Sequence, residues 1–409
     1  MNRSLTKYIS ILTLIISVFA LNGCSEDAPS NEILIKAGTE AAKDAQTAFI
    51  EAEEGNIIIF EAGVFSFTNT LSMDGKNEII IRGAGRDETI LDFSGQTAGG
   101  DGVLVTNSNQ VRFEDLTVRD AAGDALKARD CNTVSFVNIA TIWSGNPSKD
   151  NGAYGLYPVL CTEVYIDNCY AYGASDAGIY VGQSDIVIVK NSVAEGNVAG
   201  IEIENTTNAD VFDNEAFDNT GGILVFDLPG LTKYGNSTRV FDNNVYDNNR
   251  VNFAPAGNIV AEVPTGTGIM VLSTKNVEIF SNTISENDFA GVIVANYLIV
   301  DDTPGDPNYD PYPSGIYIHD NSHTMTGTVN KPVQTINIQA MINVIENNGF
   351  DQPNIVTDGL LMNASDLCIQ EGSATFVNVD VPSFSNVSND VTVHNCSPAG
   401  LPEVVFVPF

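Results

Sequence analysis

Short apolar runs recur along the chain every 22 or 23 residues and are separated by Gly, Asn and Asp. Segments 155–168 and 178–191 show the repeat most clearly, because Leu156 and Ile179 occupy equivalent positions 23 residues apart. Apolar and polar residues alternate within each run, and no run is long enough for a helix, so each repeat is expected to hold two or three short strands. Self-similarity at a fixed short period indicates stacked units that bury their apolar faces against one another.

A coil of this length whose strands keep one register predicts a parallel β-helix, an all-β solenoid. Successive coils lie about 4.8 Å apart, so equivalent side chains form ladders along the axis. One predicted ladder is aliphatic and points inward. A second lies at a turn, and we interpret it as structural because stacked Asn side chains hydrogen-bond one another. The inward ladder comprises Val103, Leu126, Leu156, Ile179, Ile201, Ile223, Ile269, Val292 and Ile316, and the turn ladder comprises Asp115, Asn138, Asn168, Asn191, Asn214, Asn243 and Asn282.

The residues before the repeat predict an export signal. Arg3 and Lys7 precede an apolar run over residues 9–20 that is too short for a comfortable membrane span. The segment 21–24 resembles a bacterial lipobox, which implies that Cys24 is the lipidated first residue of an outer-membrane lipoprotein, periplasmic or surface-exposed. Plain secretion and a single membrane-anchor helix are the alternatives. The predicted parts are a signal peptide (1–23), a polar tether (24–34), a parallel β-helix (35–330) and a small C-terminal β module that covers the far end (331–409).

One helix is predicted, over residues 39–54, in front of the first coil. Thr39 is its expected N-cap, small apolar residues form a stripe along it, and Gly55 ends it. A helix in this place covers the open end of the apolar column, which would otherwise be an unpaired sheet edge.

The order of this helix, the segment FEAG and the segment IRGAGRDETIL resembles the amino-terminal cap of right-handed β-helices of the pectin-lyase-like superfamily. The resemblance covers about residues 35–330. More narrowly, the segments NGAYGLYPVLC, SDAGIYVGQS, GIEIEN and GGILVFDLPGL resemble a family of bacterial parallel β-helix repeat lipoproteins. The superfamily contains lyases, hydrolases, epimerases and non-enzymes, so the resemblance implies a right-handed β-helix and leaves the activity open.

The charge balance limits the possible partners. The chain has 52 Asp and Glu against 18 Lys and Arg, a formal net charge of −34. Nucleic acid is therefore excluded as a partner, and we expect a soluble monomer outside the lipid anchor. An anionic polysaccharide is also repelled unless a local basic patch or a bound Ca²⁺ reverses the field, and Ca²⁺ is the one cofactor that the sequence leaves open.

The cysteines offer two candidate disulfides. Cys131 and Cys161 occupy the same slot in adjacent coils, at a separation that a disulfide accepts, and two stacked free thiols are the alternative. Cys368 and Cys396 bracket the C-terminal module and are a second candidate pair. Cys169 is then left over and is expected to be buried.

An outward-facing patch carries the candidate chemistry. On the first strand of each coil the residue after the inward aliphatic one is expected to face solvent, and the residue two further along joins it. The inserted segments 141–153 and 227–262 are expected to wall this face. The patch comprises Lys127, Arg129, Tyr157, Tyr180, Glu202, Glu204 and Phe226, with Trp143 and Asp227 on the flanking insertions.

These residue types suit chemistry on a uronate sugar. β-Elimination or C5 epimerisation needs a cation that neutralises the carboxylate, together with a base and an acid. Lys127 and Arg129 are the candidate cations, and Tyr157 or Tyr180 is the candidate proton shuttle. Substrate contacts are assigned to Trp143, Glu202, Glu204, Phe226 and Asp227. Glu202 and Glu204 hinder an anionic substrate unless they hold Ca²⁺, and their spacing also fits an inverting hydrolytic pair.

The sequence leaves two functions open. The first is an exported enzyme acting on a polysaccharide, either a lyase or a C5-epimerase. The second is a non-catalytic surface lipoprotein that binds a glycan or an envelope partner along the same face, and a polar outer face is also what any β-helix requires.

Overall fold

The computed structural model describes residues 31–324 and 336–409. The predicted signal peptide over residues 1–23, the lipidation site Cys24 and most of the tether lie outside the described residues. Within these two ranges no helix is long and apolar enough to cross a membrane.

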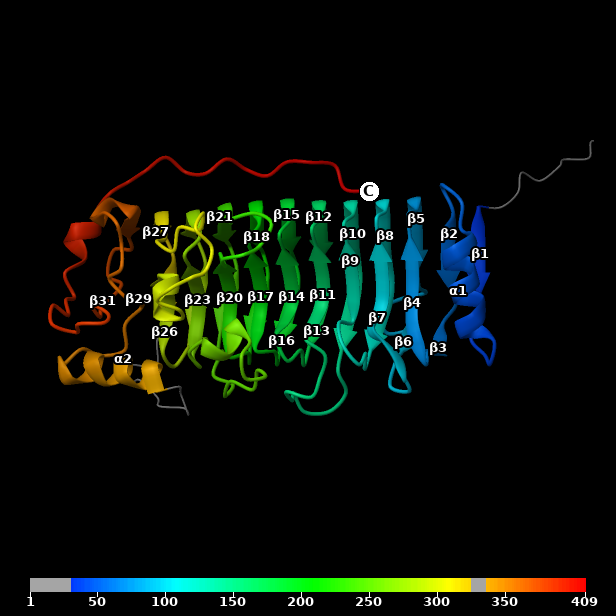
Figure 1. The fold of residues 1–409 in the computed structure, drawn as a ribbon, viewed down its shortest axis with the longest axis horizontal. Coiled ribbons are helices and arrows are strands. Elements are labelled where there is room, and N and C mark those ends of the chain that lie inside the picture. Colours follow the sequence, from blue (N-terminus) through cyan, green and yellow to red (C-terminus); the bar gives the residue numbers. More distant parts are fainter. Residues whose placement is uncertain (1–30, 325–335) are drawn as a thin grey trace, which may run out of the picture. The chain divides into compact units, whose positions relative to one another are not determined.

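The described strands form two parallel sheets that wrap around one core. Sheet B is the simpler, with a single strand from each coil, and its strands stack one after another in Figure 1. Its members are β4 (Asn69–Asp74), β7 (Ala98–Thr106), β9 (Leu126–Arg129), β11 (Tyr154–Val159), β14 (Ala177–Gly182), β17 (Ala199–Glu204), β20 (Gly221–Phe226), β23 (Thr267–Leu272), β26 (Ala290–Ala295), β29 (Ile355–Thr357) and β31 (Phe376–Asn378).

Sheet A supplies the other walls of the coil. Its two rows of strands are joined because the long strands β8 and β10 each pair with both rows. Its members are β1 (Glu32–Ile35), β2 (Ile57–Phe60), β3 (Gly63–Ser66), β5 (Asn77–Arg82), β6 (Thr89–Asp92), β8 (Asn109–Arg119), β10 (Asn132–Ile142), β12 (Thr162–Asp167), β13 (Tyr170–Tyr172), β15 (Asp185–Lys190), β16 (Val193–Glu195), β18 (Thr207–Phe212), β19 (Glu215–Phe217), β21 (Asn236–Phe241), β22 (Asn244–Tyr246), β24 (Lys275–Phe280), β25 (Thr283–Ser285), β27 (Ser314–His319), β28 (Ser322–Thr324) and β30 (Leu367–Gln370). The first strand already begins at Glu32, inside the segment predicted to be a tether.

The inward aliphatic ladder is confirmed as far as Val292. Its side chains pair in register along sheet B and are fully buried. Ile316 was assigned to the wrong sheet, because it pairs with Val277 in sheet A, and the next rung of sheet B after Val292 is Ile355. The segment Gly315-Ile-Tyr-Ile has the same pattern as a sheet B strand, and the pattern alone does not separate the two sheets.

The predicted turn ladder merges two neighbouring columns. Asp115, Asn138, Asn168 and Asn191 have left-handed backbone, with φ between 49° and 60°. The second column lies one residue further along and comprises Asn214, Asn243, Asn282 and Asn321. Hydrogen bonds between their side-chain amides join them, such as the one from Asn214 Nδ2 to Asn243 Oδ1 at 3.0 Å. A second amide ladder, at another turn, runs through Asn197, Asn219, Asn248 and Asn287.

The structure has two α-helices among its described residues, one more than the sequence predicted. Helix α1 (Ala41–Glu51) is shorter than expected, and its N-cap is Glu40, which makes no side-chain capping bond, so the role given to Thr39 was wrong. Phe49 of α1 packs edge-on against Phe60, which seals the end of the core. Helix α2 (Ile336–Asn347) was missed because its many Ile and Asn residues favour strands and turns, although Ile338, Ile342 and Ile345 share one buried face.

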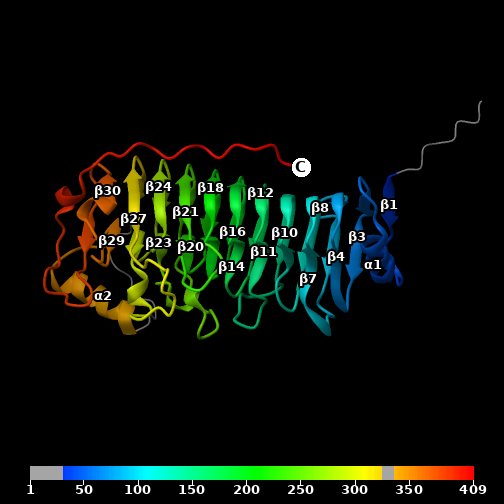
Figure 2. The same cartoon turned by 45° about the horizontal axis from the view of Figure 1, so that its top comes forward.

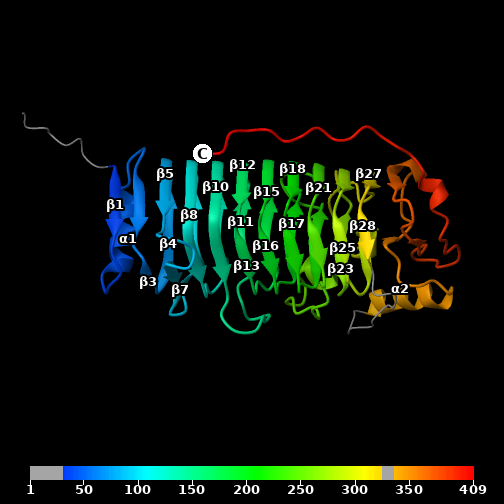
Figure 3. The same ribbon diagram turned by 180° about the vertical axis from the view of Figure 1, so that it is seen from behind.

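The C-terminal residues extend the solenoid and do not form a separate module. Strands β29 and β31 add rungs to sheet B, and β30 adds one to sheet A. The predicted disulfide between Cys368 and Cys396 is confirmed. After it, residues 397–409 return along sheet A, as Figures 2 and 3 show, and Leu401 N donates to Glu278 Oε2 at 2.8 Å.

The other predicted disulfide is wrong, because Cys131 and Cys161 carry free buried thiols. Their sulfurs face carbonyls of the preceding coil, as in the contact of 3.4 Å from Cys161 Sγ to Ala128 O. Cys169 is also free and buried, as expected.

Candidate functional site

Four predicted site residues do lie side by side on sheet B. Lys127 pairs in register with Tyr157 across β9 and β11, and Tyr180 pairs with Glu202 across β14 and β17. The ladder that the repeat predicted therefore brings side chains from four successive coils onto one strip.

Most of this strip is covered, which corrects the prediction that it faces solvent. Tyr180 is 3% exposed, Glu202 1%, Glu204 7% and Phe226 1%, because inserted segments and α2 pack over this half of the face. Both insertions were predicted to stand beside the face as walls, and residues of the insertion 227–262 also close over it.

The two flanking residues serve the fold and not a substrate. Trp143 is 4% exposed, belongs to the main core and donates from Nε1 to Ala121 O at 2.8 Å. Asp227 is buried, and its Oδ1 accepts from Gly235 N at 2.7 Å, which closes the loop after β20. Burial raises the pKa of Asp227 to about 7. Their assignment as substrate contacts was therefore wrong.

A group of half-buried side chains lies at the other end of this strip. We call it the mouth, and it comprises Asp101, Asp124, Lys127, Tyr154 and Tyr157. Lys127 Nζ lies 2.9 Å from Asp124 Oδ2 and 3.9 Å from Asp101 Oδ1, and it sits 4.4 Å from the centre of the Tyr157 ring. Burial raises the pKa of the Asp101 carboxyl, against the opposing attraction of Lys127. The mouth thus joins a cation, a phenol and two carboxyls.

Arg129 is not part of this group. Its side chain is 56% exposed and its Nε lies 3.1 Å from Asp130 Oδ2, the neighbouring residue in the chain. The predicted second cation therefore points away from the mouth.

Tyr154 belongs to the site and was missed by the sequence. Its ring centre lies 4.4 Å from that of Tyr157 and 4.5 Å from that of Tyr180. If residues alternated strictly back from the inward Leu156, Tyr154 would also point inward. A Cβ at Gly155 would meet Gly178 O at 2.3 Å, so Gly155 faces the crowded interior together with Leu156. Two consecutive inward residues shift Tyr154 to the outer face. A Gly just before an inward aliphatic residue was the available signal.

Three carboxyls lie beneath the tyrosines, and we call Asp176, Glu202 and Glu204 the carboxyl cluster. Tyr180 Oη donates to Glu204 Oε1 at 2.7 Å, and Asn258 Nδ2 donates to Asp176 Oδ2 at 3.0 Å. Both carboxyl oxygens of Glu202 are buried without a hydrogen-bond partner among the described residues.

Burial governs the protonation of this cluster. Loss of water raises the pKa of Asp176 to about 7, and it raises the pKa of Glu202 and Glu204 as well, with the mutual repulsion of the carboxyls adding to the shift of Asp176 and Glu202. Burial likewise raises the pKa of Tyr154, Tyr157 and Tyr180. Burial therefore favours the protonated form of all three carboxyls.

The cluster does not fit a calcium ion. Over residues 31–324 and 336–409 no group of three or more His, Cys, Asp and Glu side chains is arranged to bind a metal. Glu202 is also sealed from solvent, so Glu202 and Glu204 do not present the open pair of carboxyls that glycoside hydrolysis needs.

The raised pKa of Asp176 predicts a pH-dependent stability. Unfolded Asp176 is ionised above pH 4, whereas the folded side chain keeps its proton up to about pH 7, so the folded state is favoured at low pH and loses this advantage as pH rises. Between pH 5 and 7.5 the loss is about 2–3 kcal/mol. In Asp176→Asn, the free energy of unfolding in urea should differ less between pH 5 and pH 7.5 than in the wild type, by about this amount. An equal pH dependence in the variant and the wild type would mean that Asp176 is ionised in the folded state.

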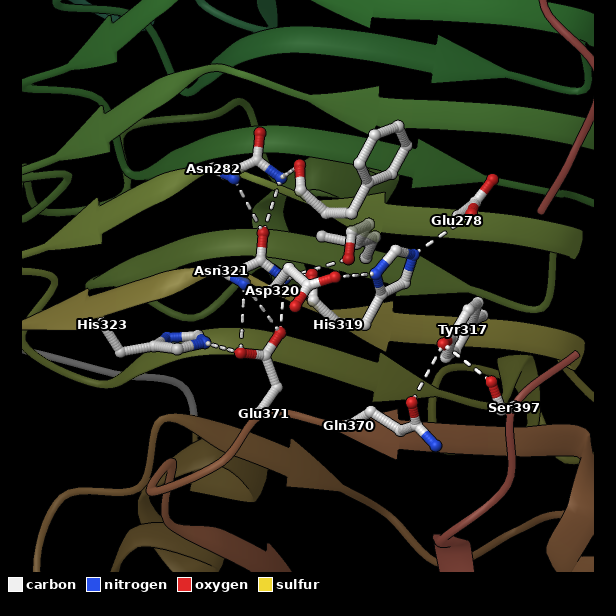
Figure 4. A network of polar contacts seen from close by, with 12 residues as sticks. Glu278, Asn282, Tyr317, His319, Asp320, Asn321, His323, Gln370, Glu371 and Ser397 are labelled. Carbon is white, nitrogen blue, oxygen red and sulfur yellow. Dashed lines mark hydrogen bonds and ion pairs between the residues drawn. The ribbon is translucent and has the colours of Figure 1, made fainter. Parts of the chain in front are cut away.

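A second polar network lies on sheet A and includes His319 and His323 (Figure 4). His319 Nε2 lies 3.1 Å from Glu278 Oε1, and its ring stacks on that of Tyr317 at 4.1 Å. Glu371 accepts from Asn321 N at 3.2 Å and lies 3.5 Å from His323 Nε2. Glu371 thereby ends the first amide ladder, and the C-terminal segment covers Glu278, so we interpret this network as structural.

Comparison with known proteins agrees with this fold. Residues 101–297 match the family model described as a right handed beta helix region. The A-module of the mannuronan C-5 epimerase AlgE4 from Azotobacter vinelandii is 15% identical with a TM-score of 0.50, over 81% of this chain and 91% of that one. For the A-module of AlgE6 from the same organism the values are 17%, 0.48, 72% and 96%. For a GH87 alpha-1,3-glucanase catalytic unit from Streptomyces thermodiastaticus they are 14%, 0.49, 84% and 52%. No curated protein matches the sequence.

These findings confirm the predicted right-handed parallel β-helix. At 15% identity the likeness concerns the fold, and it assigns no activity to the residues of the mouth.

Proposed function

We propose that this protein is an exported, lipid-anchored lyase or C5-epimerase that acts on a uronate-containing polysaccharide at the mouth. The observation that carries the proposal is the position of Lys127, whose ammonium group lies against the Tyr157 ring and beside Asp124. These are the three groups that the reaction needs: a cation for the sugar carboxylate, a base and an acid. The name of the similar epimerase module makes mannuronan the first substrate to test.

The geometry supports a division of roles. A uronate carboxylate replaces Asp101 in its long contact of 3.9 Å with Lys127, since Asp101 is the more weakly held of the two carboxyls. Lys127 then stabilises the negative charge that develops when Asp124 removes the C5 proton. Tyr157 donates a proton on the other side of the sugar ring.

Two outcomes follow from the same carbanion. If the proton of Tyr157 goes to the departing O4, the C4–O4 bond breaks and a C4=C5 double bond forms, which is elimination. If it goes to C5 from the opposite face, the sugar is epimerised and the chain stays intact. Tyr180 lies 4.9 Å from Tyr157, ring to ring, and bonds to Glu204, so the buried cluster is a source of replacement protons.

A non-catalytic glycan-binding role is the second candidate. It is favoured by the burial of Tyr180 and Glu202, because fewer polar side chains are exposed to a substrate than the sequence analysis predicted. On this account the tyrosines of the mouth are a platform on which sugar rings stack, and no bond is broken.

A glycan panel separates the two functions. The purified protein is incubated with mannuronan, pectate and a neutral glucan, with and without Ca²⁺. Product is followed by the absorbance of the unsaturated sugar and by proton NMR of C5. We expect turnover of a uronate polymer only. Binding of a polymer without either product would reject the enzyme and support the binding role, and neither binding nor turnover would reject both.

A further inference from the structure

The outer face of sheet B changes character after Glu202. The residues that continue its rung are Leu224 of β20, Met270 of β23 and Ile293 of β26, and all are buried and apolar. They form a second hydrophobic core outside the solenoid, together with α2 and the covering loops. The outer face of sheet B beyond Glu202 is therefore buried in apolar contacts, in addition to the interior of the coils.

This outer core is not completely filled. A cavity of about 290 Å³ lies between the sheet and its cover. Glu262 is the one charged residue on its wall. Six separate segments line the cavity, represented by Phe226, Val263, Met270, Leu298, Met341 and Phe384.

The lining decides what can occupy the cavity. Apart from Glu262, the side chains that line the cavity are apolar, so water inside it gains few hydrogen bonds from side chains. Moving an apolar chain from water onto such a lining is favourable. An apolar group that fills the cavity is therefore bound favourably.

We propose that the cavity is a binding site for a single alkyl or acyl chain whose head group carries no negative charge. Its volume corresponds to about ten water molecules at roughly 30 Å³ each, the space of a chain of about eight to ten carbons. The carboxylate of exposed Glu262 on the wall and the formal net charge of −34 disfavour an anionic head. This site is distinct from the mouth and does not depend on the activity proposed there.

The test uses the uncharged fluorophore N-phenyl-1-naphthylamine on the full protein. We expect saturable binding that decan-1-ol displaces and that decanoate displaces at least tenfold less well. Ala340→Phe, which adds bulk to the wall from α2, should weaken binding at least tenfold. Asn347→Phe places the same ring on an exposed position of α2 and should bind as the wild type does.

Leu298→Trp repeats the test from a different segment, so that a fold defect in one variant does not decide the result. The proposal is overturned if the wild type gives no saturable signal. It is also overturned if both filled variants, folded by circular dichroism, bind the fluorophore as tightly as the wild type. Equal displacement by decan-1-ol and decanoate would reject the stated head-group chemistry.

Discussion

Replacing Lys127 by Met should lower kcat/KM on a uronate polymer by about 10²–10³-fold, which is the effect of removing one charge-stabilising group from an acyl-transfer site. Met keeps much of the apolar stem that packs on Tyr157, so the change removes the charge and little else. Tyr157→Phe should lower kcat by about 10²-fold and leave KM nearly unchanged, because the ring remains and the proton donor is lost.

Sheet A offers a matched control for both variants. Lys190 Nζ lies 5.3 Å from the Tyr165 ring and 3.8 Å from Asp167 Oδ2, so it repeats the arrangement of Lys127 on a different face. Lys190→Met and Tyr165→Phe should change kcat/KM by less than about threefold. If the sheet A variants lose as much activity as the sheet B variants, the mouth is not the reaction site.

Asn243→Ala is expected to cost the largest share of stability of any single change considered for the solenoid. Asn243 Oδ1 accepts from the backbone N and from Nδ2 of Asn214, and its own Nδ2 donates to Val211 O and Asn282 Oδ1. Alanine leaves several of these buried groups without partners, at about 1–3 kcal/mol each. The free energy of unfolding in urea should fall by about 3–5 kcal/mol.

Asn191→Ala is the control for the amide ladder. Asn191 is exposed, makes one side-chain bond, from Nδ2 to Asp167 Oδ1, and has a φ of 49°. Its replacement should cost only about 1–2 kcal/mol, mostly from placing alanine in a left-handed conformation. If both variants lost the same free energy of unfolding, the buried amide ladder would contribute no more to stability than an exposed turn residue does.

The repeat made the fold predictable, and the errors lie where the period gives no information. Val103 through Val292 follow the period and were placed correctly. Ile316 was misplaced because a sheet A strand and a sheet B strand share one alternating pattern. Asn214 was merged with Asn191 because the coils from Ile179 to Ile201 and from Ile201 to Ile223 have 22 residues where earlier ones have 23, and one missing residue shifts the column by one position.

The site was predicted in its order but not in its exposure. The repeat predicted correctly that Lys127, Tyr157, Tyr180 and Glu202 lie together, because the pairing register of the strands is set by the backbone alone. The covering segments have no period, and nothing in the strand pattern says that the loop carrying Asn258 reaches Asp176. The exposure of a side chain on a solenoid depends on such non-repeating loops, and sequence periodicity does not describe them.

Hydrogen exchange with and without a uronate oligomer tests the central claim most directly, because it reports which face the sugar covers. Two loops, residues 144–153 and 249–258, hang from one edge of the solenoid (Figure 1). Asn151 of the first donates to Gly173 O at 2.6 Å and Asn258 of the second donates to Asp176 Oδ2 at 3.0 Å, so both contact the turn before the strand that carries Tyr180. We predict slower exchange of their amides when the oligomer is bound, and no change in residues 397–409. Protection confined to residues 397–409 and sheet A, or no protection at saturating oligomer, would contradict the account.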